Sequence, residues 1–324
     1  MGARSRVCHK DVCDDGYRRA GLIDLHRHLE GSLRPATVAE LTGREEAQAR
    51  ALIQLDGPVE DLVAYLRCND FAVEALVDLK ACERVAAEAV EDAAAEGLER
   101  LELRFSPLFM SRPHALEPVA VVEAVLSGVR SAASEHGLPT AVIGIMSRTF
   151  GPQSCARELD ALLAHREQIA GLDLAGDEAA WPGDLFEEHF RRGRDAGWHV
   201  TVHAGEAAGA AGVRHAVERL GAERVGHGVR AVEDPWVVEL LAQREIPLEI
   251  SLTSNIQTRT FTSYAEHPIG HLVSQGVLVA ITTDNPTASA TTLPRELGTA
   301  APAAGLSSAQ IAAAHRTAAE HTFA

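Results

Sequence analysis

Short apolar runs alternate with longer stretches of helical periodicity along this chain of 324 residues. The runs are rich in aliphatic and β-branched residues and predict eight strands, at 22–25, 100–105, 141–146, 171–174, 199–202, 224–226, 248–250 and 277–282. Strands that alternate with helices are typical of repeated βα units, which build parallel sheets. Eight such units predict a closed (β/α)8 barrel of the TIM type, within the α/β class.

The stretches between the runs predict the helices that cover this barrel. In segment 78–98 apolar residues recur at intervals of three and four, and Gly97 provides a stop. The insertion at 35–76 is longer than one helix, so we expect extra helices after strand one that cover the barrel mouth. No Pro- or Ser-rich linker marks a second domain. Residues 21–324 are therefore expected to form one domain behind a disordered leader at 1–20.

Polar residues of catalytic type lie where these runs end. His26 and His28 end the first run, and the period of two along a strand places both imidazoles on the same side. Active sites of this fold are built where strands end and βα loops begin. The barrel therefore predicts that one rim collects six residues, namely His26, His28, Gly176, His203, His227 and Asp284.

Imidazole nitrogens with a carboxylate oxygen suit zinc and similar divalent metals. Three or four protein ligands with one open position form the catalytic arrangement of zinc. For any single residue of this set, a histidine satisfied by local hydrogen bonds is the ordinary interpretation. Their shared position at strand ends favours a metal-dependent hydrolase with one zinc ion per chain.

Composition narrows the range of partners. The net charge of −16 argues against binding to nucleic acid or to an anionic membrane. No apolar stretch approaches the length of a membrane span, and the N-terminus has no apolar signal region. The five cysteines follow no disulfide framework and indicate reduced thiols. We therefore expect a soluble, cytoplasmic enzyme that acts on a small molecule.

A series of longer motifs runs through the chain in a fixed order: HRHLEGSLRP, ELRFSP, GIMSRTFG, LDLAGDE, GWHVTVHAGEA, ERVGHGV, LTSNIQT and TTDNP. From about residue 22 to its end the chain resembles the bacterial adenosine deaminases of the amidohydrolase superfamily, which are metal-dependent. The resemblance implies hydrolytic deamination of adenosine, or of a related or modified adenine nucleoside, at C6. The products would be ammonia and an inosine-type nucleoside.

The resemblance also implies a role for each motif residue. It assigns four side chains to one zinc ion that holds a water or hydroxide in its open position, namely His26, His28, His203 and Asp284. Glu206 matches the acid that protonates purine N1, and His227 matches the residue that orients and helps to deprotonate the attacking water. Gly176 matches a backbone N–H donor to the purine ring. His28 is further expected to contact the substrate, and Asp284 to take part in catalysis.

These implied roles agree with elementary chemistry. Attack at C6 needs a hydroxide at neutral pH, and zinc lowers the pKa of bound water to about 7. The attack also needs a proton on N1, which a Glu kept neutral by its surroundings can donate. Glu206 is therefore expected to be neutral when substrate binds. Taken alone, Glu206 could also be a carboxylate favoured at a helix N-terminus, and His227 a loop residue bonded to a backbone carbonyl.

Two positions depart from the pattern of the family. Asn285 stands where a second aspartate usually contacts purine N7, and an amide can donate a hydrogen bond there but carries no charge. Glu30 stands where adenosine-specific members more often have Asp against the sugar hydroxyls. We expect reduced activity on adenosine or a changed base. The alternatives are a deaminase or cyclic-amide hydrolase for another heterocycle, and a catalytically weakened purine-binding homologue.

Overall fold

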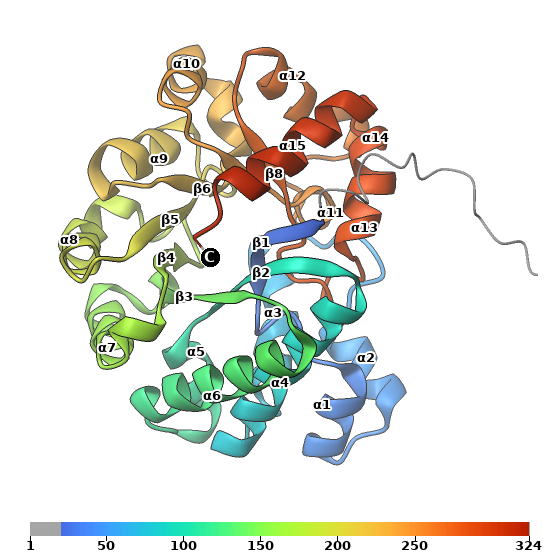
Figure 1. Cartoon of the computed structure of the whole chain (residues 1–324), viewed down its shortest axis with the longest axis vertical. Coiled ribbons are helices and arrows are strands. Elements are labelled where there is room, and N and C mark those ends of the chain that lie inside the picture. The colour runs from blue at the N-terminus through green and yellow to red at the C-terminus, as the bar shows by residue number, and fades with distance from the viewer. Residues whose placement is uncertain (1–20, 324) are drawn as a thin grey trace, which may run out of the picture.

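Eight parallel strands form the centre of the structure, a computed structural model that describes residues 21–323. Each strand pairs with its neighbour in chain order, and the helices lie around them (Figure 1). The strands are β1 (Leu22–His28), β2 (Leu98–Phe105), β3 (Thr140–Ser147), β4 (Gly171–Ala175), β5 (His199–Ala204), β6 (Arg224–His227), β7 (Leu248–Ile250) and β8 (Val279–Ile281).

A single bridge joins the last strand to the first. It pairs Arg27 of β1 with Asp284, which lies beyond the end of β8. The His28 N–H donates to the Asp284 carbonyl at 2.7 Å, and the Asp284 N–H donates to the His26 carbonyl at 2.8 Å. The predicted (β/α)8 barrel is therefore confirmed, and its closure places Asp284 directly beside the two histidines of β1.

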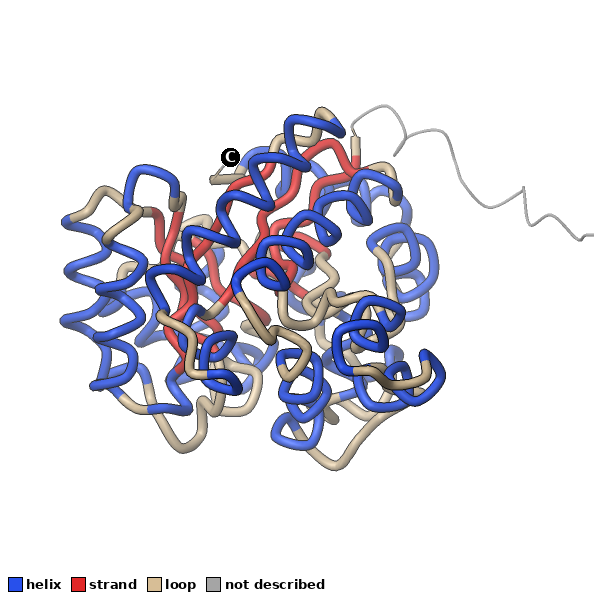
Figure 2. The backbone as a smooth tube through the Cα atoms, turned by 90° about the horizontal axis from the view of Figure 1, so that it is seen from below, coloured by secondary structure: helices blue, strands red, loops and turns tan. Residues whose placement is uncertain are grey.

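Helices follow every strand and surround the sheet, which Figure 2 shows in the interior. The α-helices are α1 (Pro35–Thr42), α2 (Glu46–Ile53), α3 (Leu62–Val73), α4 (Leu79–Ala95), α5 (Pro107–Ser111), α6 (Pro118–His136), α7 (Pro152–Leu163), α8 (Glu187–Asp195), α9 (Ala210–His215), α10 (Pro235–Gln243), α11 (Leu252–Gln257), α12 (Ile269–Ser274), α13 (Leu293–Arg295), α14 (Ala301–Ala303) and α15 (Ser308–Glu320).

Local sequence explains where these helices begin and end. The Asp78 side chain caps α4 by accepting a hydrogen bond from the Ala81 N–H, and Gly97 follows the helix with a φ of +87°. The Ser307 side chain caps α15 in a capping box with Gln310. In α4 the buried residues recur every three or four positions, so one face packs on the barrel and on α6.

The insertion after strand one forms helices, as expected. It contains α1, α2 and α3, which precede α4. Side chains of α3 line the cavity beside the strand ends, including Leu62, Tyr65, Leu66 and Asn69. The prediction that inserted helices cover the barrel mouth is therefore confirmed for α3.

The strand bounds differ from the sequence prediction in two places that concern the site. β1 continues to His28 instead of ending at residue 25, so both histidines belong to the strand. β8 ends at Ile281, so Asp284 lies three residues beyond the strand rather than at its end. Asp284 itself has a φ of +63°, which is left-handed rather than extended backbone.

The last described residues lie across the opposite end of the barrel. The Phe323 N–H donates to Glu102 of β2, and the Phe323 ring lies 3.5 Å from the Arg224 guanidinium. Figure 1 places the last described residues, drawn in red, near the centre of the ring of strands. Within residues 21–323 no helix has the length and apolar character needed to cross a membrane. The predicted leader at 1–20 lies outside the described residues.

Candidate active site

The barrel brings the four predicted metal ligands together at one rim. The Nε2 atom of His28 lies 3.2 Å from that of His26 and 3.1 Å from that of His203. The Asp284 Oδ1 atom lies 3.3 Å from His28 Nε2 and 3.6 Å from His26 Nε2. Ligands held about 2.0–2.1 Å from a zinc ion in a tetrahedron lie about 3.3 Å from one another. The chemistry and spacing of these donors therefore fit a single divalent metal.

A second combination of residues at this rim could also hold a cation. Donor atoms of His26, His203, His227 and Asp284 all lie within 4.8 Å of one another. We favour the set that contains His28, because its spacings match a ligand shell more closely. The His227 Nδ1 atom, in addition, already accepts a hydrogen bond from the Asn255 amide at 3.0 Å.

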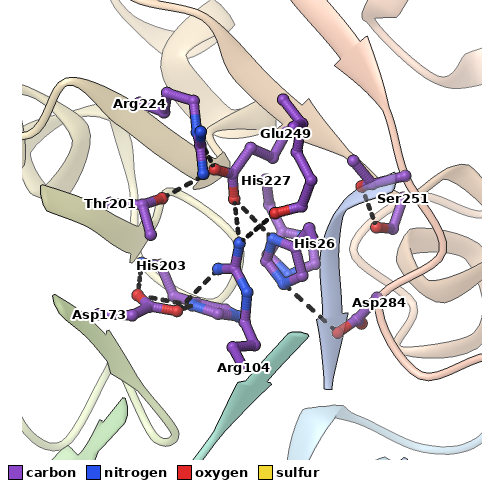
Figure 3. Close-up of polar contacts among 12 residues, drawn as sticks. His26, Arg104, Asp173, Thr201, His203, Arg224, His227, Glu249, Ser251 and Asp284 are labelled. Atoms are coloured by element: carbon purple, nitrogen blue, oxygen red, sulfur yellow. Dashed lines mark hydrogen bonds and ion pairs between the residues drawn. The ribbon is translucent and has the colours of Figure 1, made fainter. Parts of the chain in front are cut away.

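A buried ionic network orients two of the histidines. His26 Nδ1 lies 2.8 Å from Glu249, and His203 Nδ1 lies 2.9 Å from Asp173. The Arg104 guanidinium donates to both carboxylates, at 2.8 Å to Asp173 and 2.9 Å to Glu249, and Figure 3 shows it between them. Because each carboxylate holds Nδ1, both rings direct Nε2 toward the centre of the cluster.

Two of these groups, His28 and Asp284, have pKa shifts that suit metal binding. Burial lowers the pKa of His28 well below the ordinary value, so the imidazole is neutral. Burial alone would raise the pKa of Asp284. The hydrogen bond to His26 and the neighbouring imidazoles nevertheless hold that pKa well below its usual range. A neutral imidazole and an ionised carboxylate are the forms that bind a metal.

Glu206 lies beside this cluster in a site that keeps it protonated. It is buried, its Oε1 atom has no hydrogen-bond partner among the described residues, and its Oε2 atom lies 3.6 Å from His227 Nε2. Burial raises its pKa well above the ordinary value, and the charges of Asp284 and Glu178 add to the rise. The raised pKa gives Glu206 the neutral form that a proton donor needs.

His227 is the last residue of β6 and has a φ of +59°. Burial lowers its pKa to about 3, so the ring is neutral at physiological pH. The Asn255 amide that contacts Nδ1 in turn lies 3.2 Å from the His267 ring. These contacts fix the ring and leave Nε2 facing Glu206. Left-handed backbone at a residue other than glycine is uncommon and is concentrated at functional sites.

Gly176 follows β4 and lines the same cavity. Its φ is +110°, and a Cβ at this position would lie 2.4 Å from Thr149 Oγ1. Only glycine fits this backbone without a shift of its neighbours. The predicted placement of Gly176 after strand four is confirmed.

The cavity at the rim has two adjoining compartments. The inner compartment, of about 40 Å³, is lined by His28, His203, Glu206, His227 and Asp284, and by α3. The outer compartment, of about 290 Å³, is lined by polar and aromatic side chains that include Glu30, Ser106, Ser147, Phe109 and Phe150. His28, Leu66, Asn69, Ala175 and Gly176 line both compartments.

Glu30 presents one free carboxyl oxygen to the outer compartment. Its Oε1 atom accepts a hydrogen bond from the Ser106 N–H at 2.6 Å, whereas Oε2 is buried without a partner within residues 21–323. Burial raises the pKa of Glu30 to about 7. A buried oxygen without a partner is costly, so Oε2 is suited to accept a hydrogen bond from a bound ligand.

Several residues that organise the site escaped the sequence prediction. Asp173 and Glu249 carry charge inside otherwise apolar strands, and that irregularity was the available signal. Arg104 gave no such signal, because β2 also contains Arg100 and Glu102. Glu178 accepts hydrogen bonds from four successive backbone N–H groups, Gly205 to Ala208, and thereby holds the loop that carries Glu206. The pairing of Asn69 with Asn285 had no signal in the sequence, because the two residues meet only through tertiary packing.

A parallel barrel with a histidine and carboxylate cluster at the carboxyl ends of its strands is typical of metal-dependent barrel hydrolases. The family model for adenosine deaminase matches residues 22–324. The chain therefore belongs to the adenosine deaminase family and is a hydrolytic enzyme of the aminohydrolase type.

Individual relatives agree with this assignment. The chain is 50% identical over 301 residues to an adenosine deaminase of Edwardsiella ictaluri, with 90% of each chain covered. It is similar to the structure of an adenine deaminase from Arthrobacter aurescens, with a TM-score of 0.85, 25% identity and 94% of each chain covered. It is also similar to an N6-methyl-AMP deaminase from Arabidopsis thaliana, with a TM-score of 0.81 and 26% identity over 96% of this chain and 94% of that chain.

Proposed function

We propose that this chain is a zinc-dependent deaminase that hydrolyses the C6 amino group of adenosine or of a related adenine nucleoside. The products are ammonia and an inosine-type nucleoside. The observation that carries the proposal is the position of Glu206, a carboxylic acid held neutral by burial, beside a cluster of three histidines and an aspartate. An acid of this kind can protonate a ring nitrogen while water attacks the adjacent carbon.

The donor set supports zinc as the metal. His26, His28, His203 and Asp284 would hold it, since nitrogen-rich ligands with one carboxylate suit zinc better than magnesium or calcium. When bound there, the ion supplies an activated water at neutral pH.

The chain's own residues would then divide the remaining work. Glu206 donates its proton to N1 of the purine. His227, neutral and fixed by Asn255, holds the attacking water by a hydrogen bond at Nε2. The Gly176 N–H binds an acceptor on the ring. The Asn285 amide has one N–H free for N7, because its other N–H donates to Asp284 at 2.7 Å.

The outer compartment favours a nucleoside over a nucleotide. Its lining includes the carboxylates of Glu30, Asp70 and Asp177, and Arg67 is the one Lys or Arg among its lining residues within 21–323. A 5′-phosphate would add negative charge to this acidic lining. A sugar hydroxyl can instead donate to the free oxygen of Glu30.

The proposal is tested by measuring ammonia release from adenosine, 2′-deoxyadenosine, adenine, AMP and N6-methyladenosine with protein of determined zinc content. We expect the highest kcat/KM for an unphosphorylated adenine nucleoside. Release of no ammonia from any of these compounds by the zinc-loaded protein would contradict the proposal. A preference for AMP would support the deamination reaction but contradict the proposal that the substrate is a nucleoside.

A further inference from the structure

Two buried amides connect the inserted helix α3 to the candidate metal centre. The Asn69 Nδ2 atom of α3 donates to Asn285 Oδ1 at 2.9 Å, and the Asn285 Nδ2 atom donates to Asp284 Oδ1 at 2.7 Å. Asn69 and Asn285 are 5% and 3% exposed. The chain of bonds therefore runs from the metal-facing carboxylate to the boundary between the two compartments.

The direction of this chain of hydrogen bonds follows from Asp284. An ionised carboxylate only accepts hydrogen bonds, so Asn285 must turn its NH2 group toward Asp284 and its carbonyl toward Asn69. Asn69 must then turn its own NH2 group toward Asn285. The Asn285 side chain packs directly against the backbone of Gly31, where a Cβ would come within 1.9 Å of Asn285 Oδ1.

This arrangement leaves one acceptor without a partner at the boundary. Asn69 Oδ1 is buried and makes no hydrogen bond within residues 21–323, although Asn69 lines both compartments. Buried carbonyl oxygens in folded proteins nearly always have a donor. The missing donor is therefore expected to belong to the bound ligand.

The chemistry of an adenine nucleoside limits what that donor can be. The donor group of its base is the 6-amino group, which must face the reacting centre in the inner compartment. Donors at the boundary with the outer compartment therefore come from the sugar, which carries the hydroxyls. The geometry points to Asn69 as a specificity-determining residue that accepts a hydrogen bond from one sugar hydroxyl. This inference rests on the proposed function.

Asn285 acts in this arrangement as a positioning residue for Asn69. An amide at position 285 can donate to Asp284 and accept from Asn69 at the same time, which an ionised carboxylate cannot do. The amide at 285 thus links recognition of the sugar to the geometry of the metal centre.

The test compares adenosine with its 2′-deoxy, 3′-deoxy and 5′-deoxy analogues and with free adenine, in the wild type and in Asn69→Leu and Asn69→Ser. In the wild type at least one deoxy analogue should lose about tenfold or more in kcat/KM, because it leaves Asn69 Oδ1 unpaired. In both variants the preference for adenosine over that deoxy analogue should disappear. The preference for adenosine over the other deoxy analogues should persist. Cys68→Ser, on the same helix but outside both compartments, is the matched control.

The outcomes separate recognition from a structural role. If the Asn69 variants lower kcat/KM for all nucleosides by the same factor, Asn69 only supports the fold and the inference is overturned. A loss of kcat/KM in the Asn69 variants that is confined to free adenine would also overturn the inference. The group that donates to Asn69 Oδ1 would then be a ring N–H of the base. If the wild type releases no ammonia, the proposed function fails. In that case the role of Asn69 is still tested by calorimetric measurement of the affinities for the same compounds. If the Asn69 variants distinguish adenosine from its deoxy analogues as well as the wild type does, the role of Asn69 is contradicted.

Discussion

At the scale of single residues, protonation and hydrogen-bond direction decide what the site can do. Glu206 keeps its proton because burial and two neighbouring carboxylates disfavour its charge. Asn285 presents N–H groups where a carboxylate would present acceptors. The raised pKa of Glu206 and the bonding partners of the Asn285 amide both come from the surroundings, so the residue type alone did not determine them. The sequence predicted that Glu206 lies at the barrel rim and is neutral. It could not show which residues form hydrogen bonds with Asn285.

Replacing Glu206 by Gln tests its role as an acid. Gln has nearly the same shape but cannot transfer a proton, so kcat is expected to fall by about 10²–10⁴-fold with zinc content unchanged. The pKa of Glu206 is raised, so wild-type activity should be present at lower pH and fall as the pH rises through that pKa. A pH profile of kcat measures this. Full activity in Glu206→Gln would contradict the assignment.

Replacing Asn285 by Asp tests the hydrogen-bond chain through its effect on stability. The new carboxylate would lie close to Asp284, and repulsion should raise its pKa. At low pH the protonated side chain can still donate to Asp284, whereas at higher pH the two charges repel. The unfolding temperature of the variant relative to wild type is therefore expected to fall as pH rises from 5 to 8. At pH 8 the free energy of unfolding should be lower than that of wild type by about 1–3 kcal/mol. A loss that does not depend on pH would contradict the direction of these bonds.

At the scale of elements, strand ends supply the reactive groups and strand interiors hold them in place. His26, His203 and His227 lie at or near the carboxyl ends of their strands, as the barrel rule predicts. Their support comes from charged residues within β2, β4 and β7, which pair across the barrel interior. Single-strand periodicity identifies which positions face inward but not which inward residues meet. For this reason the rim was predictable and the network beneath it was not.

Replacing Arg104 by Met tests the network beneath the rim. Two buried carboxylates, Asp173 and Glu249, would lose a cationic partner, and breaking a buried ion pair costs about 3–5 kcal/mol. Zinc affinity should fall by about 10–100-fold, because His26 and His203 would lose their orientation. Denaturation and zinc titration measure the two effects. Arg214→Ala, which removes an exposed pair with Glu218, is the control and should change neither quantity appreciably.

At the scale of the whole molecule, the barrel joins segments that are far apart in the chain. The closing bridge sets Asp284 against β1, and this places the last of the proposed metal ligands beside the first two. The eight strands were predictable because each apolar run is short and bounded by polar residues. The left-handed backbone at Asp284, beyond the end of β8, was not predictable, because local residue patterns do not specify it. Likewise, a helix of the insertion was expected to cover the barrel mouth, but the hydrogen bond between Asn69 of α3 and Asn285 was not expected.

In the proposed reaction, zinc bound at this rim drives deamination of an adenine nucleoside. Its most direct test is ammonia release from adenosine during stepwise return of zinc to chelator-treated protein, with bound metal measured at each step. We expect activity to rise in proportion to bound zinc and to stop rising at one ion per chain, and thermal stability to rise with it. Activity that is unchanged after complete removal of the metal, or absent at full zinc occupancy with every nucleoside tested, would contradict it.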